Sequence, residues 1–153
     1  PDLKIIVAGR GEDIDQYKNM IKNKDTFKFV NHFIDVKDVS GFFQRASIIV
    51  IPYKEATQSG LVPLAYSFSK PVVATNVGGL PEQIQEGIHG FLVPSGNEKY
   101  FAFKVLQLLT NDKLRFKLGK NAKKFYDTTL SEDVISSRLM KTYKKTLESI
   151  NKT

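Results

Sequence analysis

The chain has 153 residues, of which 41% are hydrophobic and 25% charged, a balance typical of one globular domain and not of a disordered or fibrous protein. It contains no cysteine, which excludes disulfides, thiolate catalysis and cysteine-ligated metal sites. The net charge of +7 favours anionic partners such as nucleic acid, anionic lipid or nucleotide phosphates. No apolar run approaches the roughly 20 residues that cross a bilayer, and no signal-peptide pattern is visible, so we expect a soluble, cytoplasmic chain.

Strand and helix patterns alternate through the first two thirds of the chain. Continuous β-branched runs ended by glycine, as in LKIIVAG at residues 3–9, are typical of strands buried on both faces of a parallel sheet. Segments with apolar residues three and four positions apart predict the intervening helices. In chain order we expect a strand at 3–9, a helix at 12–22, a strand at 27–33, a helix at 36–46, a strand at 47–53, a helix at 60–69, a strand at 70–79, a helix at 80–87 and a strand at 90–96.

The pattern becomes entirely helical from Asn97 onward. Three helices are predicted there, and each carries one apolar stripe. The stripes are Phe101, Val105, Leu108 and Leu109; then Leu114, Leu118, Ala122 and Phe125; then Leu139, Tyr143 and Leu147. Alternating strands and helices followed by this tail predict an α/β fold, a doubly wound parallel sheet with a C-terminal helical tail.

The segment EATQSG at residues 55–60 follows one predicted strand and precedes a helix. Ligands of open α/β sheets lie beyond the carboxyl ends of the strands, where such loops meet. Thr57 and Ser59 offer hydroxyl groups, Gln58 offers an amide, and Gly60 allows close approach of the backbone. A helix N-terminus next to these groups suits a phosphate. The alternative is that Thr57 or Ser59 merely caps the helix.

A second glycine-containing turn, TNVGGLPE at residues 75–82, follows the next predicted strand. Its Gly78 and Gly79 predict a second helix entrance on the same edge, so that the two loops flank one ligand. They can equally be ordinary turn residues. Arg10 follows the first strand and is the cationic partner expected for a diphosphate, with a solvated arginine as the alternative. Neither a Walker loop nor GxGxxG is present, because Ile14 occupies the position of the third glycine.

Four segments occur in a fixed order, namely GLVPL at 60–64, KPVVAT at 70–75, NVGGLPE at 76–82 and HGFLVP at 89–94. In this order and spacing they resemble the donor-binding half of the retaining GT-B glycosyltransferases of the group 1 type, also called family 4. The resemblance covers nearly the whole chain. It implies a Rossmann-like half of a GT-B fold that serves hexose transfer, with retention, from a nucleoside diphosphate sugar to an acceptor hydroxyl. The TQSG form of the loop resembles enzymes of surface-polysaccharide assembly.

The resemblance implies diphosphate contacts for residues 57–61, whereas Arg10, Gly78 and Gly79 follow from the loop patterns above. The set expected to bind the donor diphosphate and sugar is Arg10, Thr57, Gln58, Ser59, Gly60, Leu61, Gly78, Gly79 and Glu82. Phe33 and Ile34 are expected beside the base, with core packing of these side chains as the competing explanation. For Glu82, a first-turn carboxylate that complements the helix dipole is the alternative to a sugar contact.

The sequence departs from the family pattern at the acidic positions. The family usually has two glutamates separated by seven residues, and here Thr57 and Ala65 occupy those positions. Glu55 is a candidate replacement, against the alternative of an exposed loop carboxylate, so the catalytic residue stays unknown. His32 and His89 are interpreted as structural or exposed. No metal motif is evident, and the expected cofactor set is empty, with the nucleotide sugar acting as substrate.

Relative to the family, the chain lacks the acceptor domain and the first βα unit of the donor domain, whose Arg and Lys clamp the diphosphate. We therefore expect residues 1–153 to be a single, truncated domain that is inactive alone. The expected partners are a nucleotide-sugar donor and a sugar or lipid-linked sugar acceptor, with peripheral contact of the parent enzyme at the inner membrane face and no nucleic acid. The alternatives are a non-catalytic basic module that binds nucleic acid or anionic membrane, and another GT-B enzyme such as a sugar-nucleotide epimerase.

Overall fold

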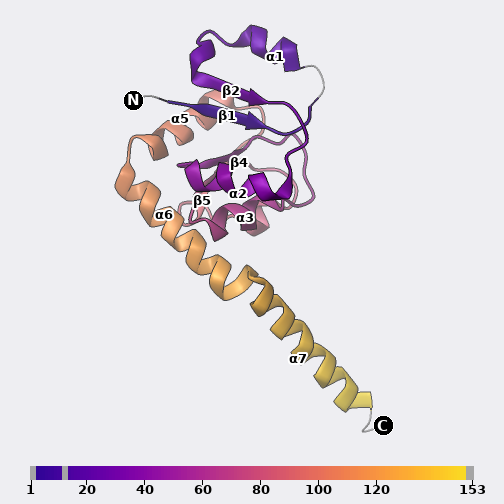
Figure 1. Ribbon diagram of the computed structural model, residues 1–153. Coiled ribbons are helices and arrows are strands. Elements are labelled where there is room, and N and C mark those ends of the chain that lie inside the picture. Colours follow the sequence, from indigo (N-terminus) through magenta and orange to yellow (C-terminus); the bar gives the residue numbers. More distant parts are fainter. Residues whose placement is uncertain (1–2, 12–13, 151–153) are drawn as a thin grey trace. The chain divides into compact units, whose positions relative to one another are not determined.

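The computed structural model describes residues 3–11 and 14–150, the last of these for its backbone only. The chain divides into two compact units, Pro1–Phe42 and Phe43–Thr153 (Figure 1). The described strands are parallel and alternate with helices, so the predicted α/β class is confirmed. They form two hydrogen-bonded sheets, one within each unit, where the sequence predicted one sheet.

The first unit contains a two-stranded parallel sheet. Strand β1 (Ile5–Ala8) pairs with β2 (Phe27–Val30). Helix α1 (Ile14–Met20) and the 3-10 turn η1 (Lys24–Thr26) connect the two strands, and α2 (Val36–Arg45) follows β2. Ile6 and Val7 are 41% and 44% exposed, so the prediction of a first strand buried on both faces is wrong. The physical reason is that a sheet of two strands has little neighbouring structure to cover it.

The second unit is built on three parallel strands in the order β3-β4-β5, namely β3 (Ile49–Ile51), β4 (Val72–Thr75) and β5 (Gly90–Val93). All four residues of the central strand β4 are buried, as its uninterrupted apolar sequence predicts. At the start of β5 a Cβ atom on Gly90 would lie 1.9 Å from the carbonyl oxygen of Val72. Glycine is therefore required there for the two strands to approach.

Helices cover this three-stranded sheet. They are α3 (Leu61–Ser67), α4 (Leu80–Gln83), α5 (Glu98–Leu109) and α6 (Asp112–Phe125). Asn97 and Asn111 cap α5 and α6, each accepting a hydrogen bond from the backbone amide three residues later. One core cluster joins β4, β5, α5 and α6 through Val73, Phe91, Val93, Leu108 and Leu118. The first two apolar stripes predicted for the tail thus pack on the sheet.

Helix α6 also lies close to the turn between α3 and β4. That turn ends α3 with two hydrogen bonds of 2.9 Å, from the Ser69 amide to Tyr66 and from the Lys70 amide to Ala65. Ser69 has φ +57°, in the left-handed position that usually holds glycine at such a helix end. A Cβ atom on Gly119 would lie 2.2 Å from the Ser69 carbonyl oxygen, so α6 approaches the turn through its glycine.

The third tail helix has a different environment. After the π-helical turn η2 (Tyr126–Leu130), α7 (Glu132–Ile150) follows α6 (Figure 1). Its predicted stripe is uncovered, since Leu139, Tyr143 and Leu147 are 49%, 56% and 61% exposed. No helix in the described part of the chain is both long and apolar enough to cross a membrane.

Candidate functional site

Two loops leave the same edge of the β3-β4-β5 sheet. One follows β3 and includes residues 55–60, and the other follows its parallel neighbour β4 and includes residues 76–79. The Gly79 amide donates to the Thr57 carbonyl at 3.1 Å and lies 3.4 Å from the Ala56 carbonyl oxygen. The two loops are therefore in direct backbone contact, and the expectation that they share one edge is confirmed.

The glycine pair is required by this loop contact. Gly78 has φ +52°, and a Cβ atom on it would lie 1.4 Å from the Ala56 carbonyl oxygen. A Cβ atom on Gly79 would lie 2.1 Å from the Thr57 carbonyl oxygen. Packing of one loop on the other thus accounts for both glycines, whatever else binds at this edge.

Ser59 is turned inward and is fully engaged. It is 5% exposed, and its amide donates to Gln83 Oε1 at 3.1 Å while its carbonyl accepts from Gln83 Nε2 at 3.2 Å. Its hydroxyl accepts the Leu61 amide at 3.3 Å, at the start of α3. The amides of Ser59 and Leu61, which the family resemblance directs at a diphosphate, donate within the chain here. The N-cap of α3 is Gly60, without a side-chain cap hydrogen bond, so the alternative that Thr57 or Ser59 caps the helix is wrong.

The outward side of the same loop carries the remaining polar groups. Thr57, Gln58 and Gly60 are exposed. Among the described residues, none accepts a hydrogen bond from their backbone amides. Helix α3 has only seven residues, so its dipole adds little, and the loop groups themselves are what this edge offers to an anion.

Neither candidate carboxylate is held in place by the loops. Glu55 is exposed, and Glu82 is exposed in the first turn of α4, where its amide donates to the Gly79 carbonyl at 3.2 Å. Within residues 3–11 and 14–150, no three His, Asp or Glu side chains converge in a group that would hold a metal ion. The geometry assigns no catalytic residue.

Three candidate residues belong to the first unit. Arg10 follows β1 and is exposed; Phe33 and Ile34 follow β2, with Phe33 79% exposed and Ile34 half-buried. The two strand ends are joined, because the Gly9 amide donates to the Val30 carbonyl at 3.1 Å and the Gly11 amide donates to Asn31 Oδ1 at 2.8 Å. Arg10, which is expected to contact the diphosphate, therefore follows the same edge of the β1-β2 sheet as Phe33 and Ile34, which are expected beside the base. The exposure of Phe33 disagrees with the alternative that this side chain packs in a core.

An aromatic cluster lies behind the loops. The His89 ring stacks on Phe125 with centroids 4.6 Å apart and meets Tyr66 edge-on at 5.4 Å. The Tyr66 hydroxyl donates to the Gln83 carbonyl at 3.2 Å. Burial raises the pKa of Tyr66 and lowers the pKa of His89, so both side chains are neutral at pH 7. His89 is thus a core residue, in agreement with its structural interpretation.

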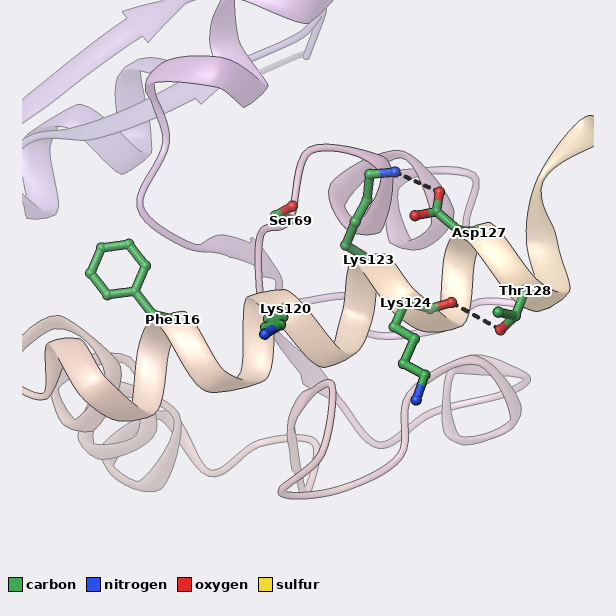
Figure 2. Close-up of a pocket in the computed structure, with 7 residues that line it drawn as sticks. All are labelled: Ser69, Phe116, Lys120, Lys123, Lys124, Asp127 and Thr128. Carbon is green, nitrogen blue, oxygen red and sulfur yellow. Dashed lines mark hydrogen bonds and ion pairs between the residues drawn. The ribbon is translucent and has the colours of Figure 1, made fainter.

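A separate open pocket of about 570 Å³ lies along α6 and η2 (Figure 2). Its lining residues are Ser69, Phe116, Lys120, Lys123, Lys124, Asp127 and Thr128. Lys123 turns toward Asp127 and pairs with it at 2.5 Å, whereas Lys124 points away from that pair. The pocket includes none of the residues expected to bind the donor.

No pattern in the sequence indicated the role of Gln83. A glutamine at the end of a short helix is usually solvated, and its partner Ser59 lies 24 residues earlier. The one available hint is that PEQ follows the glycine pair directly, which places Gln83 on the same edge as the loop that it contacts.

The family described as "Glycosyl transferases group 1" matches residues 1–125. An uncharacterized glycosyltransferase of Methanocaldococcus jannaschii is 35% identical over 88 residues, which are 58% of this chain and 25% of that protein. The capsular polysaccharide biosynthesis glycosyltransferase CapM of Staphylococcus aureus is 26% identical over 147 residues, 93% of this chain and 38% of CapM.

Among solved structures, the Anabaena protein HepE in complex with UDP superposes with a TM-score of 0.84 at 18% identity, over 95% of this chain and 42% of HepE. At this identity the likeness concerns the fold, which is the predicted Rossmann-like one. The chain spans less than half the length of each of these three proteins. Because the family match extends from the first residue to the end of α6, this chain belongs to the glycosyl transferases group 1 family.

Proposed function

We propose that this chain is the donor-binding part of a longer retaining glycosyltransferase, which transfers a hexose from a nucleoside diphosphate sugar to an acceptor hydroxyl. The observation that carries the proposal is the joined pair of loops at residues 55–60 and 76–79, within a chain of this family. The fold likeness to a protein solved with UDP supports a nucleotide as the ligand.

The chemistry expected at the loops is stabilisation of the departing diphosphate. Negative charge grows on this group as the bond to the sugar breaks. The open amides of Thr57, Gln58 and Gly60 are fixed by the loop contact and need no reorganisation as that charge develops. Within the first unit, Arg10 stays the predicted diphosphate contact, and Phe33 and Ile34 stay the predicted base contacts.

The remaining parts of the reaction belong to the rest of the enzyme. The chain spans 38% of CapM, so we infer that a sugar or lipid-linked sugar acceptor binds to a domain outside residues 1–153. The same comparison supports surface-polysaccharide assembly as the proposed pathway. A location of the enzyme at the inner face of the membrane stays a prediction. Residues 1–153 alone are expected to be inactive.

A binding panel tests the proposal. Calorimetry or ligand-observed NMR of the complete polypeptide that contains residues 1–153, with UDP-, GDP- and ADP-sugars, is expected to show selective binding of one nucleotide. Gly60→Asp removes room and adds negative charge at the loop, so it is expected to weaken that binding about tenfold or more. Gly41→Asp in α2, where nothing lies within 4 Å of a Cβ atom and φ is not positive, is the control.

Absence of binding across the whole panel would contradict the proposal. Salt-dependent binding of DNA or anionic liposomes, with no nucleotide sugar bound, would favour the basic-module alternative.

A further inference from the structure

We propose that Gln83 is a positioning residue that holds the donor loop, residues 57–60, in the conformation that receives the diphosphate. The inference rests on the proposed function and extends it to a residue that does not itself contact the ligand. It starts from one pair of hydrogen bonds, in which Gln83 Oε1 accepts from the Ser59 amide at 3.1 Å and Gln83 Nε2 donates to the Ser59 carbonyl at 3.2 Å.

This pairing requires a primary amide. A glutamine side chain carries a donor and an acceptor on the same carbon atom, so it pairs with both backbone groups of one residue as a neighbouring strand would. Glutamate keeps only the acceptor, methionine keeps neither group at a similar length, and asparagine is one methylene shorter. Ser59 is 5% exposed, so losing the pair leaves its amide without an acceptor and with little access to water, while its carbonyl keeps the Val62 amide at 3.3 Å.

Gln83 is itself anchored from the other side. Its carbonyl accepts the hydroxyl of Tyr66, which is 0% exposed on α3. Four residues earlier, the Gly79 amide binds the Thr57 carbonyl. The segment 79–83 therefore holds the donor loop at two points, Thr57 and Ser59, while the buried hydroxyl of Tyr66 fixes the segment.

The two Gln83–Ser59 hydrogen bonds form a clamp, and the direction of these bonds connects the clamp to ligand binding. Gln83 engages the inward backbone groups of Ser59, and its neighbours Gln58 and Gly60 are exposed. The carbonyl and the N–H of one peptide plane point in opposite directions, so holding the Ser59 carbonyl inward directs the Gly60 amide outward. The Gly79 amide holds the Thr57 carbonyl and thereby does the same for the Gln58 amide. The clamp thus supplies preorganisation, which contributes to binding only if the donors already point to where the phosphate lies.

The test compares Gln83→Met and Gln83→Glu with the wild type in the complete polypeptide that contains residues 1–153. Gln85→Met is the matched control, because Gln85 is exposed and its side chain makes no hydrogen bond among the described residues. Deuterium exchange of the Ser59 amide reports the clamp without ligand. We expect it to accelerate about tenfold in Gln83→Met and to stay unchanged in Gln85→Met.

Affinities for UDP, GDP and ADP, each set against the matching nucleoside, report the positioning role. We expect Gln83→Met to lose about tenfold in affinity for the diphosphate that the wild type binds, with nucleoside affinity unchanged. Gln83→Glu is expected to lose more, because its carboxylate faces the Ser59 carbonyl and adds negative charge near the diphosphate. A mere loss of fold would weaken nucleoside and diphosphate binding alike.

Three results separate the failures. Unchanged Ser59 exchange in Gln83→Met, or unchanged diphosphate affinity beside a wild type that binds, overturns the positioning role and leaves the proposed function standing. A wild type that binds none of the three diphosphates overturns the proposed function and the positioning role with it. Accelerated exchange together with a loss confined to diphosphate affinity establishes the inference.

Discussion

Helices α6 and α7 carry the same kind of sequence pattern and lie in different environments. Both have apolar residues every three or four positions. In α6 this face is in the core, with Leu118 and Ala122 0% exposed, whereas Leu139 and Leu147 of α7 are about half exposed or more, at 49% and 61%. The periodicity therefore predicts a helix and its apolar face, but the structure that covers that face has to come from elsewhere.

The largest expected effect is a cavity on the α6 side of this comparison. Leu118→Ala removes a fully buried side chain from the cluster with Val73 and Leu108, so it should lower the free energy of unfolding by about 2–5 kcal/mol. Leu139→Ala on α7 should change it by less than about 0.5 kcal/mol, since alanine also favours the helix. Urea unfolding of residues 1–153, followed by circular dichroism, measures both values.

Equal losses of unfolding free energy in Leu118→Ala and Leu139→Ala would contradict the difference between α6 and α7. In particular, a loss of several kcal/mol for Leu139→Ala would show that α7 is covered in solution by another surface, such as a second copy of the chain. Measuring the oligomeric state of both variants would then identify the cause.

A smaller effect is expected where α6 meets the α3–β4 turn. A Cβ atom on Gly119 would lie 2.2 Å from the Ser69 carbonyl oxygen, which is backbone and moves only with the turn. Gly119→Ala should therefore destabilise the chain by about 1–3 kcal/mol, despite the better helix propensity of alanine. The same unfolding measurement determines the change.

Gly41→Ala in α2 is the control, because nothing lies within 4 Å of a Cβ atom at that position. It should be neutral or stabilising by about 0.5–1 kcal/mol. A stabilising Gly119→Ala would mean that α6 stands further from the turn than the structure shows.

Most of the element order was predictable because local patterns determine it. The apolar run of β4 and the asparagine caps of α5 and α6 are signals within a few residues of the chain. Strand lengths were overestimated, as in β3, which has three residues where seven were expected. Strand ends depend on pairing with neighbours, and the sequence of one strand does not contain its partner's register. The separation into two sheets is of the same non-local kind.

The sequence predicted where the two loops lie in the fold, but it did not predict most of the contacts that they make. The glycines at 78 and 79 and the polar residues at 57–60 indicated two loops at one edge, which the structure contains. It was not predictable that Ser59 would turn inward, because its partner Gln83 is distant in sequence and looks like a surface residue. Which residues bind the donor stays a prediction.

The smallest expected effect concerns His89, which packs against Phe125 at the end of α6, where the chain continues toward α7. The ring is 6% exposed, and its Nδ1 has no hydrogen-bond partner among the described residues. Burial lowers its pKa below the usual 6.5. The unfolded chain therefore binds a proton at this histidine at a higher pH than the folded chain does. The contribution of His89 to the free energy of unfolding should be fully present above pH of about 6.5 and be lost as the pH falls below it.

Replacing the ring isolates this contribution. His89→Phe keeps an aromatic side chain against Phe125 but does not titrate, so its stability should decline less between pH 7 and 5 than that of the wild type. His32→Asn, which changes the other of the two histidines, should keep the wild-type decline. Identical pH profiles for His89→Phe and the wild type would mean that His89 is hydrated in solution. The end of α6 next to α7 would then be less tightly packed than the rest of α6. The difference in burial between the two helices would begin within α6 itself.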